Sequence, residues 1–195
     1  MTRLLWLPLA LALAGPASAA DPAAPPQPSD LTEKSSADLA EELFARLAKT
    51  PDENEAAGIV AALQALWLRS GSDTSDLLMA RAHAALGLEN YSLAISLLDV
   101  VVIDDPDWAE GWNARATARF YAGDPKGSAA DVAQTLKRNP RHLGALSGLA
   151  AIFEQAGQKD NALKIYQRAL ALAPNYKPLR ESAARLKHEM EGQAL

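Results

Sequence analysis

Apolar residues recur along much of the chain at the spacing of an α-helix. In residues 157–174, Ala162, Tyr166 and Ala169 are separated by four and then three positions, so they share one helical face. A glycine precedes this helix and a proline closes it, as is typical of the residues that flank helices. The segment therefore predicts one amphipathic helix with its entry turn and its end.

The same segment occurs three times at a fixed period. The copies occupy residues 89–106, 123–140 and 157–174. Each copy ends in a proline, and Pro106, Pro140 and Pro174 follow one another at intervals of 34 residues. Because one period holds two helices and their turns, it predicts an all-α fold, an α-solenoid of stacked helix-turn-helix repeats.

Residues 75–176 resemble three tetratricopeptide repeats. In each repeat a bulky residue early in the first helix precedes an alanine by one turn; the pairs are Leu78 with Ala82, Trp112 with Ala116, and Leu146 with Ala150. The second helices carry Ala94, Leu98 and Val101, then Ser128, Val132 and Thr135, then Ala162, Tyr166 and Ala169. Gly123 and Gly157 occupy the turn between helices, whereas Glu89 departs from the pattern. The resemblance implies that the first helices line a concave groove and the second helices form its convex back.

Further helices are expected on both sides of the three repeats. Residues 36–74 predict two amphipathic helices, with Thr50 as the cap of the second. We interpret this pair as a diverged first repeat that caps the array, and we expect Trp67 to pack on the first true repeat. Residues 177–195 predict a C-terminal capping helix, because their apolar residues share one helical face and charged residues occupy the rest.

The N-terminal residues differ from the rest of the chain. Residues 1–20 combine Arg3, an apolar run and an Ala-Ser-Ala end, which is the pattern of a secretory signal peptide cleaved after Ala19. The run is shorter than the ~20 residues that span a bilayer, which disfavours an uncleaved anchor. Residues 21–35 are proline-rich and predict an extended linker, with a proline-rich ligand for another protein as the alternative. We therefore expect a periplasmic or secreted protein.

Composition narrows the classes of function. The chain has 195 residues, of which 49% are hydrophobic, and a net charge of −5, which suits one soluble domain and argues against nucleic acid binding. The absence of cysteine excludes disulfides, thiolate metal sites and a cysteine nucleophile. His83, His142 and His188 are far apart in the sequence and no catalytic motif surrounds them. We expect no enzyme, no metal site and no cofactor.

The resemblance also implies which side chains face the groove. The residues expected to bind a partner are Met79, His83, Trp108, Asn113, Thr117, Phe120, Tyr121, Ser147 and Glu154. The aromatic residues are candidate anchors, while Asn113 and Thr117 are candidate hydrogen-bonding groups for a peptide backbone. The alternative for Phe120 and Tyr121 is that they fill the space between neighbouring helices.

The charge of the ligand is inferred from groove positions. One subclass of the resembling family grips the terminal carboxylate of a peptide with basic and amide residues. The corresponding positions here hold Met79, His83, Ala114, Gly144 and Gly148. That clamp is therefore absent, and the carboxylates of Asp76, Glu110 and Glu154 favour a neutral or basic partner. Arginines on the first helices are expected to make structural contacts; they are Arg81, Arg115 and Arg119.

Together these features predict an exported protein–protein interaction module whose groove binds a peptide or helix of an envelope protein. The alternative is a homo-oligomeric structural scaffold or assembly factor of the cell envelope, in which helix faces meet another copy. Exposed apolar residues in the groove favour the first function. Exposed apolar residues on the convex back or the terminal helix favour the second.

Overall fold

The computed structural model describes residues 35–192, and this part of the chain consists of helices joined by short turns, without a strand. The helices are α1 (Ser36–Leu47), α2 (Glu53–Trp67), α3 (Asp73–Gly87), α4 (Tyr91–Asp104), α5 (Ala109–Tyr121), α6 (Pro125–Arg138), α7 (Leu143–Gln155), α8 (Lys159–Leu172) and α9 (Lys177–Gly192). The predicted all-α fold is confirmed. The predicted signal peptide and residues 21–34 of the linker lie outside the described residues. No helix within 35–192 has both the length and the hydropathy to cross a membrane.

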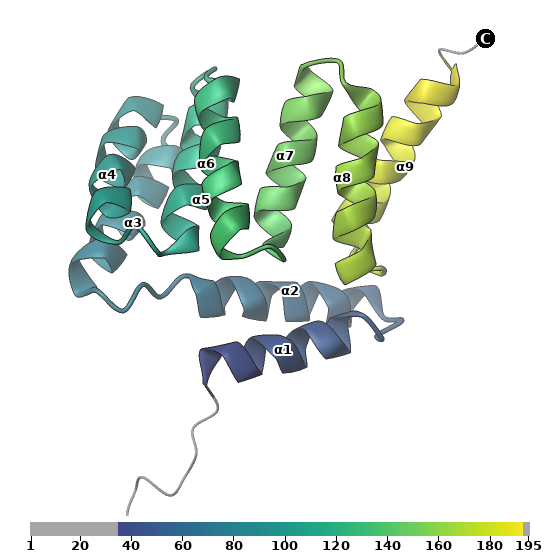
Figure 1. Cartoon of the computed structure of the whole chain (residues 1–195), viewed down its shortest axis with the longest axis horizontal. Coiled ribbons are helices and arrows are strands. Elements are labelled where there is room, and N and C mark those ends of the chain that lie inside the picture. Colours follow the sequence, from purple (N-terminus) through teal and green to yellow (C-terminus); the bar gives the residue numbers. More distant parts are fainter. Residues whose placement is uncertain (1–34, 193–195) are drawn as a thin grey trace, which may run out of the picture. The chain divides into compact units, whose positions relative to one another are not determined.

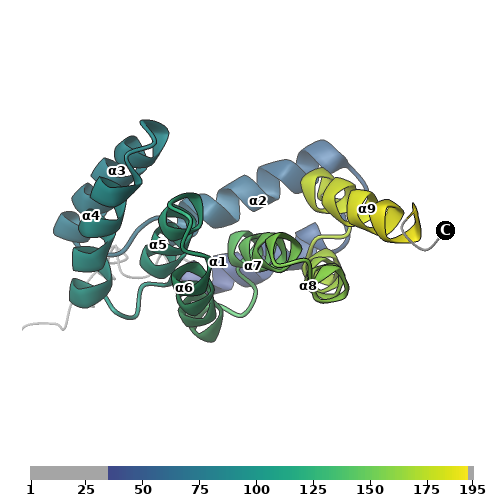
Figure 2. The ribbon, with the colours of Figure 1, turned by 90° about the horizontal axis from the view of Figure 1, so that it is seen from above.

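Helices α3 to α8 form three antiparallel pairs that stand side by side, with α9 next to α8 (Figure 1). Each predicted repeat contributes one pair, in the order α3 with α4, α5 with α6, and α7 with α8. Figure 2 shows α3, α5, α7 and α9 along one side of the row and α4, α6 and α8 along the other. The first helices of the repeats thus share one face, as expected for an α-solenoid.

Small residues of the repeat pattern lie in the cores of these pairs. Ala82 and Ala150 on the first helices are completely buried and Ala116 is 3% exposed, while Ala94 and Ala162 on the second helices are completely buried. Alanine at these positions lets helix backbones approach closely, so that larger side chains can interlock around them. A large residue at any of them would overpack the pair.

The turn inside each repeat needs one residue with positive φ. Gly123 and Gly157 have φ angles of 81° and 72°, and the equivalent residue of the first repeat, Glu89, has a φ of 57°. A side chain in this left-handed region costs on the order of 1 kcal/mol relative to glycine, because Cβ crowds the backbone. The first repeat therefore forms the same turn as the others at the cost of local strain.

The start of α2 differs from the sequence prediction. Asp52, and not Thr50, caps the helix, because its carboxylate accepts hydrogen bonds from the backbone N–H groups of Asn54 and Glu55. The Thr50 hydroxyl donates to the Glu55 carboxylate at 2.5 Å instead. Together with Arg46, this bond lowers the pKa of Glu55.

The N-terminal helix pair, α1 and α2, is not the first layer of the stack. Its buried residues, such as Leu47 and Leu63, share one apolar cluster with residues of α7, α8 and α9. Trp67 stacks on His142, with ring centroids 4.8 Å apart, so the prediction that it packs on the first repeat is wrong. The apolar face of α2 instead shares its cluster with aliphatic side chains of the third repeat, such as Leu146.

The N-terminal helix pair contacts each loop that connects one repeat to the next helix. Trp108 donates its indole N–H to the Trp67 carbonyl oxygen at 2.8 Å, and His142 stacks on the Trp67 ring. Farther along, Asn175 donates its amide N–H to the Thr50 carbonyl oxygen at 2.8 Å. In Figure 1 the pair accordingly runs across the row at one end of the upright helices. These contacts fix where the array begins and ends relative to α2.

Candidate functional site

A hollow of about 250 Å³ lies between α5, α6 and α7, and we call it the groove cavity. It is lined by Asn113, Ala116, Thr117, Phe120, Tyr121, Ser128, Val132, Gly144, Ser147, Gly148 and Ala151. Five residues predicted to bind a partner are therefore brought together here. They come from two first helices of neighbouring repeats, which the stacking of the repeats places next to each other.

Aromatic rings form one wall of the groove cavity. Tyr121 is 62% exposed, and its ring is met edge-on by Phe120, with centroids 5.8 Å apart. Tyr91, the first residue of α4, stacks on the other side of Tyr121 at 5.9 Å. The predicted role of Tyr121 did not include Tyr91, which lies two residues after Glu89 in the sequence. Phe120 and Tyr121 thus line the cavity, and Tyr91 contacts Tyr121 from α4.

The floor of the groove cavity, on α7, has small side chains. Gly144, Ser147, Gly148 and Ala151 follow one another at helical spacing on the side that faces the cavity. A Cβ atom placed on Gly148 would meet no heavy atom within 4 Å. Because no large side chain fills this space, an incoming apolar group can approach the backbone of α7 closely.

Polar groups in the groove cavity are mostly acceptors. Thr117 donates its hydroxyl to the Asn113 carbonyl oxygen at 3.1 Å, and Ser147 donates to the Leu143 carbonyl oxygen at 2.9 Å. Asn113 donates its amide N–H to Glu110 at 2.9 Å. With these protons engaged, the hydroxyl oxygens and the Asn113 amide oxygen remain to accept hydrogen bonds. The arrangement suits a ligand that brings N–H groups, such as a peptide backbone.

A second cavity continues the groove toward the N-terminal helix pair. It has a volume of about 200 Å³ and is lined by residues of α2, α7, α8 and α9. Gly144 and Ser147 line both cavities. The side chains of Val60 and Gln64 bring α2 to the edge of this second hollow. The groove is thus bounded at this end by a helix that precedes the repeats in the sequence.

Two predicted site residues do not reach the groove. Met79 is 2% exposed and lies in an apolar cluster with Ala114 and Ala118 of α5, whose small side chains leave room for it. Trp108 lies at the junction with the N-terminal helix pair, where its indole N–H is bonded to Trp67. Both displacements arise from contacts between elements, which the spacing of residues within one helix does not reveal.

The remaining predicted residues, His83 and Glu154, do not line the groove cavity and differ in exposure. His83 is exposed on α3. Glu154 on α7 accepts a hydrogen bond from the Tyr166 hydroxyl at 2.7 Å and pairs with Arg185 of α9 at 2.7 Å. Burial, together with the Glu154 contact, raises the pKa of Tyr166 to about 12. Glu154 therefore joins α7 to α8 and α9, and its carboxylate is already satisfied.

The other groove carboxylates are also engaged within the chain. Asp76 accepts hydrogen bonds from the backbone N–H and the hydroxyl of Ser70, and these bonds lower its pKa. Glu110 lies 2.8 Å from Nε2 of His142. Nδ1 of that buried ring accepts the backbone N–H of Ala145 at 3.0 Å, which leaves Nε2 to donate to Glu110. The oxygens of these acids are therefore engaged within the chain, although the Ser70 donors bring no positive charge to offset that of Asp76.

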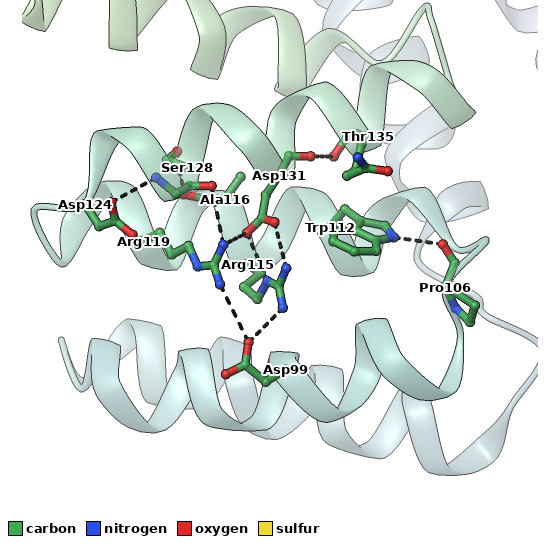
Figure 3. Close-up of polar contacts among 12 residues, drawn as sticks. Asp99, Pro106, Trp112, Arg115, Ala116, Arg119, Asp124, Ser128, Asp131 and Thr135 are labelled. Atoms are coloured by element: carbon green, nitrogen blue, oxygen red, sulfur yellow. Dashed lines mark hydrogen bonds and ion pairs between the residues drawn. The ribbon is translucent and has the colours of Figure 1, made fainter.

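An ion-pair network fixes α5, the helix that carries the aromatic wall (Figure 3). Arg115 donates two N–H groups to Asp131 of α6 at 2.9 and 2.7 Å and a third to Asp99 of α4 at 2.7 Å. Arg119 pairs with Asp131 at 2.9 Å. Burial acts to lower the pKa of Arg115, but Asp131 and Asp99 outweigh it and leave the pKa above its usual value. The predicted structural role is confirmed for Arg115 and Arg119, whereas Arg81 makes no ion pair within residues 35–192.

Comparison with protein families and relatives agrees with the repeat pattern. Residues 113–177 match the family model described as Tetratricopeptide repeat. A TPR repeat-containing protein of Rhizobium etli is 35% identical over 152 residues, which span 78% of this chain and 74% of that protein.

Solved structures share the fold of the repeats. The TPR domain of Sgt2 from Aspergillus fumigatus matches with a TM-score of 0.59 at 21% identity, covering 63% of this chain and 83% of that chain. The first TPR of Spaghetti, bound to an HSP90 peptide, matches with a TM-score of 0.58 at 20% identity, covering 62% of this chain and 98% of that chain. At such identities the likeness concerns the backbone, so binding chemistry must be argued from the residues present in this chain.

Proposed function

The chain belongs to the tetratricopeptide repeat family, and from this premise we propose that it is a protein–protein interaction module that binds a segment of another protein in the groove cavity. The observation that carries the proposal is the pairing of aromatic rings on α5, of which Tyr121 is exposed and Phe120 is half-buried between neighbouring helices, with a floor of small residues on α7. Aromatic anchors beside an unfilled hollow are typical of sites where a few side chains of a partner supply most of the affinity. The mechanism is binding by a preformed surface, without a chemical step.

The ligand that we propose is an uncharged apolar segment, either an extended peptide or a helix. Of the residues that line the groove cavity, none is Lys or Arg. The structural neighbour Spaghetti is bound to the peptide SRMEEVD, which is acidic near its end, and such a ligand would find no cation in this cavity. The carboxylates that suggested a basic partner, Asp76, Glu110 and Glu154, do not line the groove cavity either. A cavity lined by uncharged side chains supports a neutral ligand.

Gly148 offers a direct test of the site. Gly148→Leu places a side chain in the hollow, and Gly148→Ala is the matched control because it leaves most of the space open. Both substitutions replace a helical glycine whose Cβ meets nothing, so each should preserve or raise the melting temperature. The experiment is selection of a random peptide library displayed on phage against the wild-type protein and each variant.

We expect the wild-type protein and Gly148→Ala to enrich the same peptides, with apolar anchors and few acidic residues, and Gly148→Leu to lose them. A double variant, Phe120→Ala with Tyr121→Ala, should lose them as well because it removes the anchors. Equal enrichment on Gly148→Leu would show that the groove cavity is not the site. An acidic consensus would refute the proposed ligand chemistry.

We also propose that the protein works in the cell envelope, in the bacterial periplasm or outside the cell, and that its partner is an envelope protein. The support is the signal-peptide pattern of residues 1–20. Mass spectrometry of the protein recovered from a periplasmic extract should show an N-terminus directly after Ala19. Recovery of the uncleaved chain from the cytoplasm alone would refute this proposal without affecting the groove assignment.

A further inference from the structure

The outer side of α3 is an uncovered stripe of the first repeat. Leu77, Arg81, Ala84 and Leu88 follow one another at intervals of four, three and four residues, so they share one side of the helix. All four are exposed, Leu77 by 53% and Leu88 by 82%. We call these residues the α3 outer face.

The equivalent faces of the other two repeats are buried or half-buried at three of the four positions, whereas Ala122 and Ala156, the equivalents of Leu88, are exposed. Thirty-four residues after Leu77 lies Gly111 of α5, where an added Cβ would come within 2.9 Å of Val101 on α4. Ala118 of α5, the equivalent of Ala84, is completely buried, and its counterpart Ile152 of α7 is 9% exposed. This side of a first helix is thus the surface that packs on the second helix of the preceding repeat.

The polar residue of the stripe has an equivalent with a known partner. Arg81 corresponds to Arg115, which donates to Asp99 of α4, in the preceding repeat, at 2.7 Å. Arg81 has no carboxylate within ion-pair distance in residues 35–192. The face therefore carries the aliphatic residues and the arginine of an inter-repeat contact. The helix that would supply the carboxylate and the facing aliphatic residues is absent from the described chain.

Nothing in residues 35–192 covers the α3 outer face. The N-terminal helix pair, which precedes it in the sequence, is buried against α7, α8 and α9 instead. The same repeat also exposes Leu93, Val100 and Ile103 on α4. Five of the eight large hydrophobic side chains exposed in the described range thus belong to this one repeat. Of these five, Leu77 and Leu88 lie on the α3 outer face.

We propose that the α3 outer face docks an amphipathic helix of a partner protein, which takes the place of the second helix of a preceding repeat. The partner helix carries a carboxylate opposite Arg81 and an aliphatic stripe with a small residue opposite Leu77. The small residue is needed because Leu77 is larger than Gly111, which α4 already approaches closely. This surface is separate from the groove cavity, so the two proposals stand or fall independently.

A second copy of the chain fits this face less well than a partner helix. The α4 surface that meets α5, around Asp99 and Val101, is already covered within the chain. The free side of α9, at the other end of the row, is charged, with residues such as Arg180, Glu181 and Lys187. Head-to-tail stacking of copies would therefore set aliphatic side chains against charges.

The test uses a fluorescent peptide with the sequence of residues 91–105, carrying Val101→Ala to make room for Leu77. Binding to the purified protein is followed by fluorescence anisotropy. We expect saturable binding, weakened about tenfold by Arg81→Glu because the charge-assisted bond to Asp99 of the peptide is lost and repulsion replaces it. A peptide that also carries Asp99→Lys should recover that affinity on Arg81→Glu and bind the wild-type protein poorly.

The matched control is Leu93→Gln, which alters an aliphatic residue of similar exposure on the same repeat but off the stripe. It should bind like the wild-type protein, whereas Leu77→Gln should weaken binding about tenfold, with both variants melting normally. Absence of saturable binding, or equal loss with Leu93→Gln, would overturn the proposal. So would a dimer in sedimentation equilibrium that Leu77→Gln converts to a monomer, because the occupant would then be a second copy.

Discussion

The second and third repeats place opposite chemistry at the same three positions. Arg115, Arg119 and Asp131 of the second repeat correspond, 34 residues later, to Leu149, Phe153 and Ile165 of the third. In the second repeat these positions form the ion-pair network, with Asp131 only 2% exposed. In the third they pack against apolar clusters, one of which contains the N-terminal helix pair.

This difference shows which parts of the repeat the fold requires. The small residues at the helix crossings are common to both repeats, whereas the filling between them can be ionic or apolar. A filled and internally satisfied interface is sufficient, and its polarity is set by what lies next to it. Apolar filling occurs where the N-terminal helix pair adds its own leucines. The ionic network occurs at the first junction, away from that cluster.

The largest loss of stability is expected from removing the central carboxylate of the ion-pair network. Asp131→Ala should lower the free energy of unfolding by about 3–5 kcal/mol, because it leaves two arginines without their shared buried partner. The measurement is urea unfolding followed by circular dichroism. A triple variant with Arg115→Leu, Arg119→Phe and Asp131→Ile copies the third repeat and should regain most of that loss. If the triple variant is as unstable as Asp131→Ala, the two fillings are not interchangeable.

The next largest effect is expected from truncating a buried side chain in the apolar cluster around the third repeat. Leu63→Ala removes a completely buried side chain of α2 from the cluster with α7, α8 and α9, and should cost about 2–5 kcal/mol in the same unfolding experiment. The control is Leu68→Ala, next to the end of the same helix, where the side chain is 41% exposed and the cost should be small. An equal effect of both would mean that α2 is not docked on the third repeat.

A smaller effect is expected at Trp108, where the end of α2 meets the repeat that contains the ion-pair network. Trp108→Phe keeps an aromatic ring but removes the indole N–H that is bonded to the Trp67 carbonyl oxygen, and should cost about 1 kcal/mol. Hydrogen exchange should show faster exchange at the end of α2, with little change in α7. Unchanged exchange at the end of α2 would argue that this bond contributes nothing to holding the helix.

The smallest effect is confined to alkaline pH. The folded state raises the pKa of Tyr166 from 10.0 to about 12, so the unfolded chain loses this proton first and the Tyr166 contribution is lost as pH rises from 10 to 12. Tyr166→Phe should be slightly less stable than the wild-type protein at neutral pH and lose less stability across this alkaline range. The measurement is the unfolding midpoint of both proteins at several pH values across this range, with phenolate absorbance as a second readout. Parallel pH profiles would contradict the assignment.

Much of the fold could be predicted from the sequence because the determining signals are local and periodic. The closing prolines and the buried alanines are set by the sequence of a single helix, and each glycine turn depends only on the φ angle of its own residue. Glu89 departs from the sequence pattern, yet it takes the same left-handed conformation as the two glycines.

The site was predictable in part, for a related reason. Asn113, Thr117, Phe120, Tyr121 and Ser147 line the groove cavity because helical phase alone decides the direction of each side chain. Met79 and Trp108 were misplaced because neighbours from other elements decide their surroundings. The docking of α2 could not be foreseen, since an amphipathic helix shows that it needs a partner surface but not which one.

The attachments of the N-terminal helix pair have a mechanical consequence. A row of helix pairs that touch only their neighbours can stretch and bend like a coil spring. Here the N-terminal helix pair runs across the row and contacts it at three successive loops, at Trp108, His142 and Asn175. Stretching the array by pulling on its ends would have to break these three contacts together. The array should therefore be stiffer than one without such a pair, and the width of the groove should be fixed before a ligand binds.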